Sequence, residues 1–153
     1  IRGLVGSEMC IRDSYLATVH LVALGEAWTI ASKSNLDLNK TFKGIAASSG
    51  NSFVHETESQ VILNGSYNIN FTMDLVEKDV GLFQDLASKL GVELEISPLV
   101  FDIIKDAKKT FGDRAWSSMV VKRLENKYNT AFRAEGYPEE LIDLEEKSLG
   151  YEI

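Results

Sequence analysis

The chain has few residues that could carry acid–base, nucleophilic or metal chemistry, and they are far apart. Its two histidines, His20 and His55, are 35 positions apart and form no metal-binding spacing such as His-x-x-x-His. No G-x-S-x-G sequence offers a nucleophile, and Gly3-Leu-Val-Gly6 lacks the preceding strand and third glycine of a phosphate-binding loop. His20 lies among apolar residues, so we expect it to be a buried core histidine. These residues alone predict no more than a soluble helical domain without a metal site.

Length, charge and cysteine content exclude several classes of protein. The 153 residues suit one domain with one hydrophobic core. A net charge of −7 argues against a nucleic-acid partner, which needs clustered Lys and Arg. The apolar stretch from Tyr15 to Ala31 is interrupted by His20 and Glu26, so we do not interpret it as a membrane span. The single cysteine, Cys10, rules out an internal disulfide and a cysteine-based zinc site, and a cytoplasmic location is expected.

Most of the negative charge lies at the C-terminal end. Residues 135–153 hold seven acidic side chains and one lysine, which gives −6. The other 134 residues hold sixteen acids and fifteen bases and are almost neutral. We therefore divide the chain beyond residue 14 into a helical body, residues 15–134, and an acidic tail, residues 135–153, with a short helix from Glu139 to Lys147.

Apolar spacing predicts an all-α fold of six or seven helices. The first, Tyr15 to Ser34, is apolar all round, which indicates a long helix buried on several sides. Asp37 and Ser52 are suited to cap the second and third helices, Ser97 to cap a later one, and Asp113 to cap the last helix of the body. Residues 92–96 alternate in polarity without a partner strand and are expected to form an extended connector. The helices of the body are expected at about 15–34, 38–45, 52–63, 75–90, 97–112 and 113–128.

The first fourteen residues differ in character from the rest. Their apolar side chains follow neither a helical nor a strand period for long. The run from Leu4 to Ser14 resembles the translation of a transposase-adapter oligonucleotide used in sequencing libraries. We therefore expect residues 1–14 to be a foreign segment, with the protein proper beginning near Tyr15 and its upstream part missing. The alternative is a genuine but unusual N-terminal arm.

Short motifs recur along the body in a fixed order: Glu26-Ala27, Asn35–Asp37, Ser48–Ser52, Phe71, Lys78–Leu82, Gly91-Val92 and Pro98. Their order and spacing resemble the C-terminal domain of the β-hydroxyacid dehydrogenases. This family includes 3-hydroxyisobutyrate dehydrogenase, tartronate semialdehyde reductase and glyoxylate/succinic semialdehyde reductase, and it is distantly similar to 6-phosphogluconate dehydrogenase. The resemblance covers about residues 15–128.

The resemblance implies a fold and a set of site residues. In the family, a Rossmann domain binds NAD or NADP, and a helical domain with a long buried first helix closes the substrate cleft and forms the oligomer. The start of that helix carries a K-x-x-N-N motif, whose lysine is the general acid or base and whose asparagine binds substrate. Counting back from Glu26-Ala27 places the lysine on Cys10 and the asparagines on Asp13 and Ser14, so none matches. We infer that the catalytic lysine was cut off together with the upstream part.

The resemblance also places three residues around the cleft. Lys78 takes the position of a cofactor-contacting lysine, and a lysine can meet an anionic ligand or ribose hydroxyls. Phe71 and Asp79 take positions that line the substrate pocket. Two plainer interpretations stay open: a surface ion pair between Lys78 and Asp74, and a packing role for Phe71 in the core. Because adjacent helical residues face different ways, Lys78 and Asp79 are not expected to point straight into the cleft together.

The sequence therefore predicts part of an NAD(P)-dependent dehydrogenase that interconverts a small 3-hydroxy acid and its semialdehyde. The expected parent is a cytoplasmic homo-oligomer with no nucleic-acid or membrane partner, and the fragment alone is expected to be inactive. The alternative is a stand-alone helical interaction or dimerisation module without redox activity. A Rossmann reading frame with G-x-G-x-x-G upstream of Tyr15 would separate the two.

Overall fold

The structure, a computed structural model, describes residues 2–141, with side chains from residue 9 onward. This part of the chain is helical and has isolated bridges, Asn68 with Glu140 and Thr72 with Trp116, in place of strands. The predicted all-α class is confirmed. The elements are α1 (Arg2–Lys33), α2 (Leu38–Ala46), α3 (Phe53–Asn64), α4 (Met73–Lys89), α5 (Ser97–Phe111), the 3₁₀ helix η1 (Ser117–Val120) and α6 (Lys122–Tyr128).

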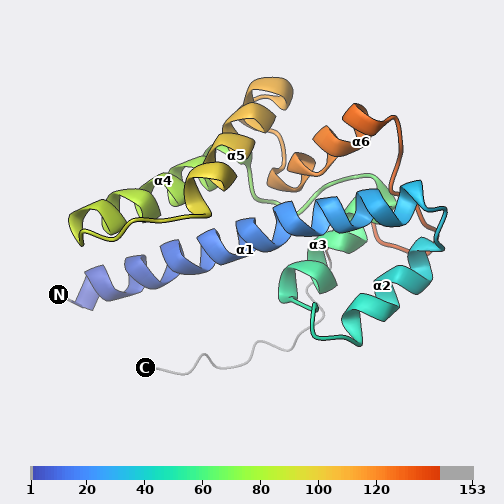
Figure 1. The fold of residues 1–153 in the computed structure, drawn as a ribbon, viewed down its shortest axis with the longest axis horizontal. Helices are drawn as coiled ribbons and strands as arrows, with labels where there is room; N and C mark the ends of the chain where they lie inside the picture. The colour runs from blue at the N-terminus through green and yellow to red at the C-terminus, as the bar shows by residue number, and fades with distance from the viewer. Residues whose placement is uncertain (1, 142–153) are drawn as a thin grey trace.

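The long helix α1 is the axis around which the other helices pack (Figure 1). Helices α4 and α5 lie along its N-terminal half, and α2, α3 and α6 gather around its C-terminal half. Its most buried apolar residues, Leu21, Leu24, Trp28 and Ala31, recur at helical spacing. The predicted start at Tyr15 is wrong, because α1 is already helical from Arg2. A helix extends at low cost once it is nucleated, so regular apolar spacing is not required for the added turns.

The core joins α1 to every other part of the fold. Its largest fully buried apolar side chains come from helices and loops alike: Trp28, Ile62, Leu63, Tyr67, Met73, Ile104 and Phe132. At Gly25 of α1, an added Cβ would lie 3.2 Å from Val121 and 3.3 Å from Leu124. This glycine therefore allows α6 to approach α1 closely.

Several predicted helix boundaries are confirmed by their caps. The Asp37 carboxylate accepts a hydrogen bond from the backbone N–H of Lys40 at 3.0 Å, and Ser52 Oγ accepts one from that of His55 at 3.0 Å. Both bonds satisfy amide groups that the first turn of a helix leaves free. Gly65 ends α3 in the left-handed region, at a φ of 94°.

Three predicted boundaries are wrong. Ser97 is the first residue of α5 and not its cap, and its buried hydroxyl has no hydrogen-bond partner within residues 2–141. Asp113 caps no helix, because residues 113–116 form a turn and the expected last helix is divided into η1 and α6. Glu139, Glu140 and Leu141 are not helical, and the rest of the predicted acidic helix lies outside the described residues.

The prediction for His20 is also wrong, because its side chain is exposed. His55 of α3 is the buried histidine. Its Nε2 lies 2.9 Å from the carbonyl oxygen of Phe42, and its Nδ1 lies 3.1 Å from Ser59 Oγ, which also accepts a hydrogen bond from Trp28 Nε1. Both ring nitrogens of His55 thus lie within hydrogen-bonding distance of groups of the fold itself.

The segment after α6 is fastened to the core by a buried polar network. The Glu125 carboxylate, 4% exposed, accepts hydrogen bonds from the Tyr67 hydroxyl, from Arg133 Nη1 at 2.9 Å and from the backbone N–H of Phe132 at 2.6 Å. Arg133 Nη2 also donates to the Tyr67 hydroxyl at 3.1 Å. Burial and the neighbouring Glu125 raise the pKa of Tyr67, so it stays a neutral donor.

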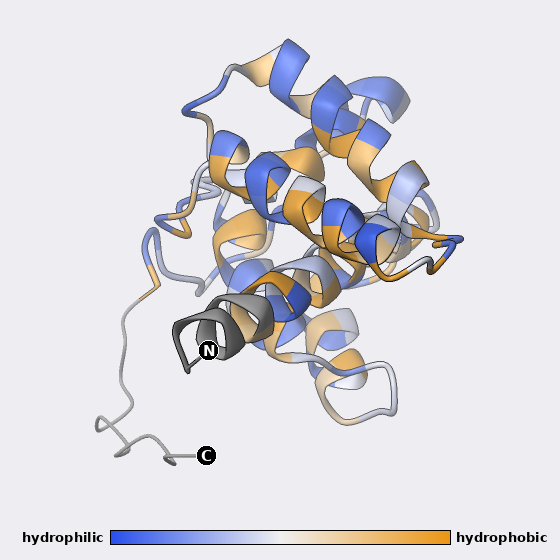
Figure 2. Ribbon diagram, turned by 90° about the vertical axis from the view of Figure 1, so that its left-hand side faces the viewer, coloured by the Kyte–Doolittle hydropathy of each residue, from blue (hydrophilic) through white to orange (hydrophobic). Residues whose placement is uncertain are grey.

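The described helices pack against one another through their apolar faces. Figure 2, viewed along α1 from its N-terminal end, shows hydrophilic and hydrophobic residues alternating along the helices. No helix in residues 2–141 is long and apolar enough to cross a membrane.

Candidate functional site

Phe71 and the motif positions of α1 come together where the first part of α1 passes α3 and the loop before α4, whereas Lys78 and Asp79 do not line this place. A cavity of about 280 Å³ lies there. Asp13 and Ser14 of α1, Glu58 of α3 and Phe71 of the loop all line it. The remaining lining residues are Ala17, Thr18, Leu21, Phe53, Thr57, Ile69, Val76, Ser117 and Leu141. We refer to this hollow as the α1–α3 cavity.

Helical spacing explains how α1 contributes to the cavity. Cys10, Asp13, Ser14 and Ala17 are spaced so that they share one face of the helix. Cys10 is exposed and does not line the cavity, but it lies one turn before Asp13, which does. The position to which the resemblance assigns the catalytic lysine is therefore at the edge of the α1–α3 cavity.

Asp79 is held between the cavity wall and a lysine. Ser14 Oγ donates a hydrogen bond to Asp79 Oδ2 at 2.9 Å, and Lys78 Nζ lies 3.4 Å from Asp79 Oδ1. The side chain of Asp79 is 18% exposed and that of Lys78 is 59% exposed. The two residues point differently, as helix geometry requires: Asp79 lies toward α1, and Lys78 lies toward solvent.

The interpretation of Lys78 as a surface partner of Asp74 is wrong. Asp74 lies 3.1 Å from Arg114 Nη1 and also accepts a hydrogen bond from the Thr72 hydroxyl. The Thr72 hydroxyl and the Arg114 guanidinium hold the pKa of Asp74 below its usual value. Lys78 pairs with its neighbour Asp79 and keeps most of its surface exposed, so its ammonium group can still meet a ligand.

Phe71 fits both interpretations that the sequence left open. It is partly buried against the hydrophobic core, and it also lines the α1–α3 cavity. Its backbone carbonyl accepts a hydrogen bond from the N–H of Ser117 at 2.9 Å, which fixes the loop against η1. The ring is thus held in place by the core while part of it faces the cavity.

Sequence reasoning missed Glu58. This residue lies on the face of α3 that carries Val54 and Ile62, both of which are buried. Glu58 is four positions from both Val54 and Ile62, so a helix would place it on their apolar face, and this spacing could have indicated a buried acid. Burial raises the pKa of Glu58 to about 8, because the charged carboxylate loses its contact with water.

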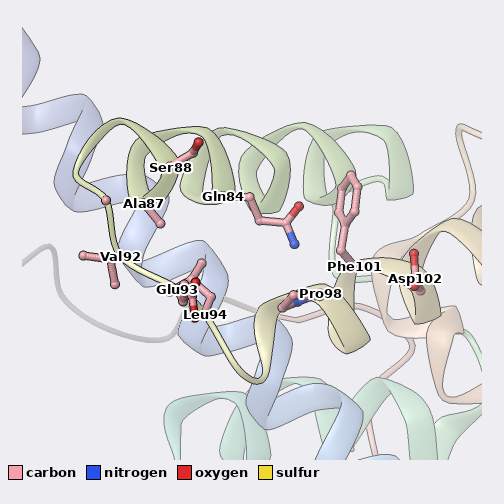
Figure 3. A pocket seen from close by; sticks show the side chains of 10 residues that line it. Gln84, Ala87, Ser88, Val92, Glu93, Leu94, Pro98, Phe101 and Asp102 are labelled. Atoms are coloured by element: carbon pink, nitrogen blue, oxygen red, sulfur yellow. The ribbon is translucent and has the colours of Figure 1, made fainter.

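Two other hollows contain none of the candidate site residues. One, of about 600 Å³, lies between α4 and α5 and is lined by Gln84, Ser88, Phe101 and Asp102 among others (Figure 3). The second, of about 440 Å³, lies between His20 of α1 and the loop before α3. Within the described residues, no three His, Cys, Asp or Glu side chains are grouped so that they could hold a metal ion.

Comparison with known proteins identifies the family. The sequence profile described as "NAD-binding of NADP-dependent 3-hydroxyisobutyrate dehydrogenase" matches residues 6–124. The chain belongs to this family. The matched range includes Asp13, Ser14, Phe71, Lys78 and Asp79. The resemblance inferred from the sequence is therefore confirmed.

Relatives in the family are longer than this chain. L-threonate dehydrogenase of Haemophilus influenzae is 27% identical over 118 residues, which are 77% of this chain and 39% of that protein. The solved structure of a 3-hydroxyisobutyrate dehydrogenase from Salmonella typhimurium matches with a TM-score of 0.71 and 27% identity, over 77% of this chain and 41% of that one. A second 3-hydroxyisobutyrate dehydrogenase structure, from Mycobacterium tuberculosis, has a TM-score of 0.69 at 22% identity over 76% of this chain and 42% of that one, and supports the fold. The chain thus spans about two fifths of the length of these relatives.

Proposed function

We propose that this chain is the helical part of an NAD(P)-dependent dehydrogenase that interconverts a small 3-hydroxy acid and its semialdehyde. The α1–α3 cavity is the observation that supports this proposal most strongly. It brings Phe71 together with position 14 of α1, which in this chain is a serine of the segment expected to be foreign and is hydrogen-bonded to Asp79. The family resemblance assigns all three positions to the substrate side of the cleft, although they come from three separate segments of the chain.

The lining residues suit a reaction from which water is excluded. Phe71, Leu21 and Val76 give the cavity apolar surface, which disfavours water beside a reacting carbon. Ser14 and Asp79 supply polar atoms at its edge that can orient a hydroxyl or carboxylate group. NAD or NADP, when bound, would accept or donate the hydride.

Among the side chains that the structure describes, that of Lys78 is the one we assign to the cofactor. Gly3 and Gly6 lie within α1, so they form no phosphate-binding loop. Lys78 does fit, because its largely exposed ammonium group at the beginning of α4 can reach a phosphate or a ribose hydroxyl. Cys10, at the position of the catalytic lysine, carries no ammonium group. We therefore infer that the 153-residue chain alone has no dehydrogenase activity.

The parent protein provides the test. The natural reading frame upstream of Tyr15 would be determined, and the full protein purified and assayed for reduction of NAD⁺ and NADP⁺ by L-threonate and 3-hydroxyisobutyrate. We expect turnover by the full protein and none by the 153-residue chain. Turnover by the short chain would contradict the loss of the lysine. An upstream frame without a dinucleotide-binding domain would favour the stand-alone interaction module.

We also infer that the parent is a cytoplasmic homo-oligomer formed through this helical domain, as the family resemblance implies. Ile30, 67% exposed, and Tyr128, 43% exposed, line a groove between α1 and α6, which Glu26 and Lys33 also border. Exposed apolar surface of this kind is typical of an interface. Light scattering of the purified parent measures its mass directly, and a monomer would contradict this inference.

A further inference from the structure

The last described part of the chain runs along the loop between α3 and α4 and reaches the wall of the α1–α3 cavity. Ser66 Oγ donates a hydrogen bond to the backbone carbonyl of Glu139 at 2.6 Å, and Asn68 Nδ2 donates one to Glu140 Oε1 at 3.3 Å. Asn68 and Glu140 also form an isolated parallel bridge. The next residue, Leu141, lines the cavity. A segment far from α1 and α3 in the sequence therefore contributes to the candidate site.

We refer to residues 138–141 as the strap. The family match ends at residue 124, so it assigns no role to the strap. Leu141 is half-buried and adds an apolar side chain to the same lining as Ile69, which is also half-buried. Moving the strap away would therefore open the cavity on the side of Ile69.

The chain just before the strap is held by the core. Phe132 is fully buried, and the backbone N–H of Ala134 donates a hydrogen bond to the carbonyl oxygen of Leu63 at 3.1 Å. The ring of Tyr137 packs edge-on against that of Phe42, with the ring centroids 5.3 Å apart. Tyr137 is thus a fixed point from which the strap begins.

The strap itself is held at the surface. Glu139 and Glu140 are exposed, and the hydrogen bonds from Ser66 and Asn68 lie at exposed positions. Exposed hydrogen bonds without a buried apolar face are typical of segments that open locally at a low cost in free energy. The strap can therefore open while the core around Tyr137 stays folded.

We propose that the strap opens and closes the α1–α3 cavity by pivoting at Tyr137, so that Leu141 controls the entry of a ligand. As a control of access to the proposed substrate site, this inference rests on the proposed function. A segment that closes over a site keeps water out while a ligand is bound and opens again to release it. The hydrogen bond from Ser66 is the latch, because it joins the middle of the strap to the loop beside it.

Labelling of a cysteine in the cavity measures the opening. In the 153-residue chain, Ile69→Cys would be combined with Cys10→Ser, which removes the exposed thiol that the chain already has. The rate of alkylation by iodoacetamide, a small uncharged reagent, then reports how often the strap exposes position 69. We expect Ser66→Ala to raise this rate about two- to tenfold, which corresponds to the loss of one hydrogen bond.

Three further chains serve as controls. Ser48→Ala is matched to Ser66→Ala, because Ser48 Oγ also donates to a backbone carbonyl at 2.6 Å, that of Gly44, outside the cavity lining. A chain that ends at Tyr137 lacks the strap and should be labelled at least as fast as Ser66→Ala. A chain that ends at Leu141 keeps the strap. The rates of this chain and of Ser48→Ala should stay within about twofold of that of the 153-residue chain.

Several outcomes would overturn the proposal. Equal labelling rates in Ser66→Ala and Ser48→Ala would do so, and so would an unchanged rate in the chain that ends at Tyr137. A third is a steep rise of the rate with urea, because local opening exposes little surface and global unfolding exposes much. If the chain that ends at Tyr137 does not fold, the comparison of the two serine variants still decides the question.

The dehydrogenase assay of the full parent separates this proposal from the proposed function. Equal labelling rates of the two serine variants, together with a parent that oxidises hydroxy acids, would remove the strap as a gate and leave the dehydrogenase intact. A parent that oxidises no hydroxy acid would instead remove the proposed function, whereas faster labelling in Ser66→Ala would still show that the strap opens.

Discussion

The hydroxyl group of Ser14 donates a hydrogen bond of 2.9 Å to the carboxylate of Asp79, which ties the first part of α1 to α4 across 65 positions of sequence. The resemblance assigns position 14 to a substrate-binding asparagine and position 79 to the substrate pocket. The two assignments were made from separate motifs, and the structure brings the residues into contact. A serine at position 14 can satisfy the Asp79 carboxylate in the absence of that asparagine.

This contact predicts a modest loss of stability in Ser14→Ala. A hydrogen bond to a partly buried carboxylate contributes about 0.5–1.5 kcal/mol to the free energy of unfolding, and Asp79 would lose the Ser14 hydroxyl and keep its ion pair with Lys78. Urea unfolding would measure the loss. Ser34→Ala, at an exposed position just after α1, is the matched control and should change the stability by less than about 0.5 kcal/mol.

A double-mutant cycle with Asp79→Ala isolates the pair. The coupling free energy should be about 0.5–1.5 kcal/mol, because each single variant already breaks the same hydrogen bond. Additive losses in the double variant would mean that the hydrogen bond contributes nothing in solution.

The raised pKa of Glu58 makes stability depend on pH. The unfolded chain releases the proton near pH 4.5 and the folded chain only near pH 8, so between these values the unfolded state binds fewer protons. Glu58 therefore destabilises the fold increasingly from pH 4.5 to pH 8, and Glu58→Gln removes this penalty. We expect the difference in free energy of unfolding between Glu58→Gln and the unaltered chain to increase by about 2–4 kcal/mol as the pH rises from 5 to 8. Urea unfolding at both pH values checks this, and a difference that does not change with pH would show that Glu58 titrates normally.

Two glycine substitutions test the network that fastens the segment after α6. An alanine at position 65, where φ is 94°, would be strained, and its Cβ would lie 2.5 Å from Arg133 Nε. Gly65→Ala should therefore displace Arg133 from Glu125 and cost about 1–3 kcal/mol. Gly44→Ala is the control, because Gly44 lies in α2 with nothing within 4 Å of its Cβ position, and it should stabilise the chain by about 0.5–1 kcal/mol. Thermal melts measure the change in Tm caused by each variant, and equal changes in Gly65→Ala and Gly44→Ala would contradict a specific role for Gly65.

The sequence predicted the parts of the fold that depend on local patterns. Asp37 and Ser52 mark helix starts because capping needs particular residue types at single positions. Ser97 and Asp113 have the same residue types and cap nothing, because the packing of α5 and η1 places the helix boundaries elsewhere. A capping residue is therefore informative only where the surrounding packing agrees with it.

Some residues of the candidate site could be proposed from sequence motifs, whereas others depend on how the helices pack and could not. Phe71 and Asp79 were found through motifs, and no periodic pattern distinguishes them from core and surface residues. Glu58 belongs to no motif, and its place in the α1–α3 cavity depends on how α3 packs against α1, which a single sequence does not specify. His20 was predicted to be buried because it lies among apolar residues, and the three-dimensional packing leaves it exposed while burying His55.

The prediction that residues 1–14 are foreign to the domain can be tested by deletion. Of the side chains that the structure describes in this segment, those of Met9, Cys10, Arg12 and Asp13 are exposed and those of Ile11 and Ser14 are half-buried, so none of the six belongs to the buried core. We expect cooperative unfolding to persist, with a loss of about 1 kcal/mol or less, comparable to that of Ser14→Ala. Calorimetry of the shortened chain measures this, and loss of a cooperative transition would support a genuine N-terminal arm.

Lys78→Ala tests the cofactor role of the lysine in the full parent protein. The side chain is 59% exposed, and the buried face of α4 is carried by Val76, Val80 and Ala87, so the free energy of unfolding should change by less than about 0.5 kcal/mol. A lost charge-assisted contact with the cofactor should cost about 1.5–3 kcal/mol of transition-state stabilisation, or roughly ten- to a hundredfold in kcat/KM. Lys89→Ala, at the far end of the same helix, is the control and should leave both values unchanged. Kinetics and melts on the same samples separate the two effects, and a kcat/KM within about twofold of the parent would leave Lys78 as a surface partner of Asp79 alone.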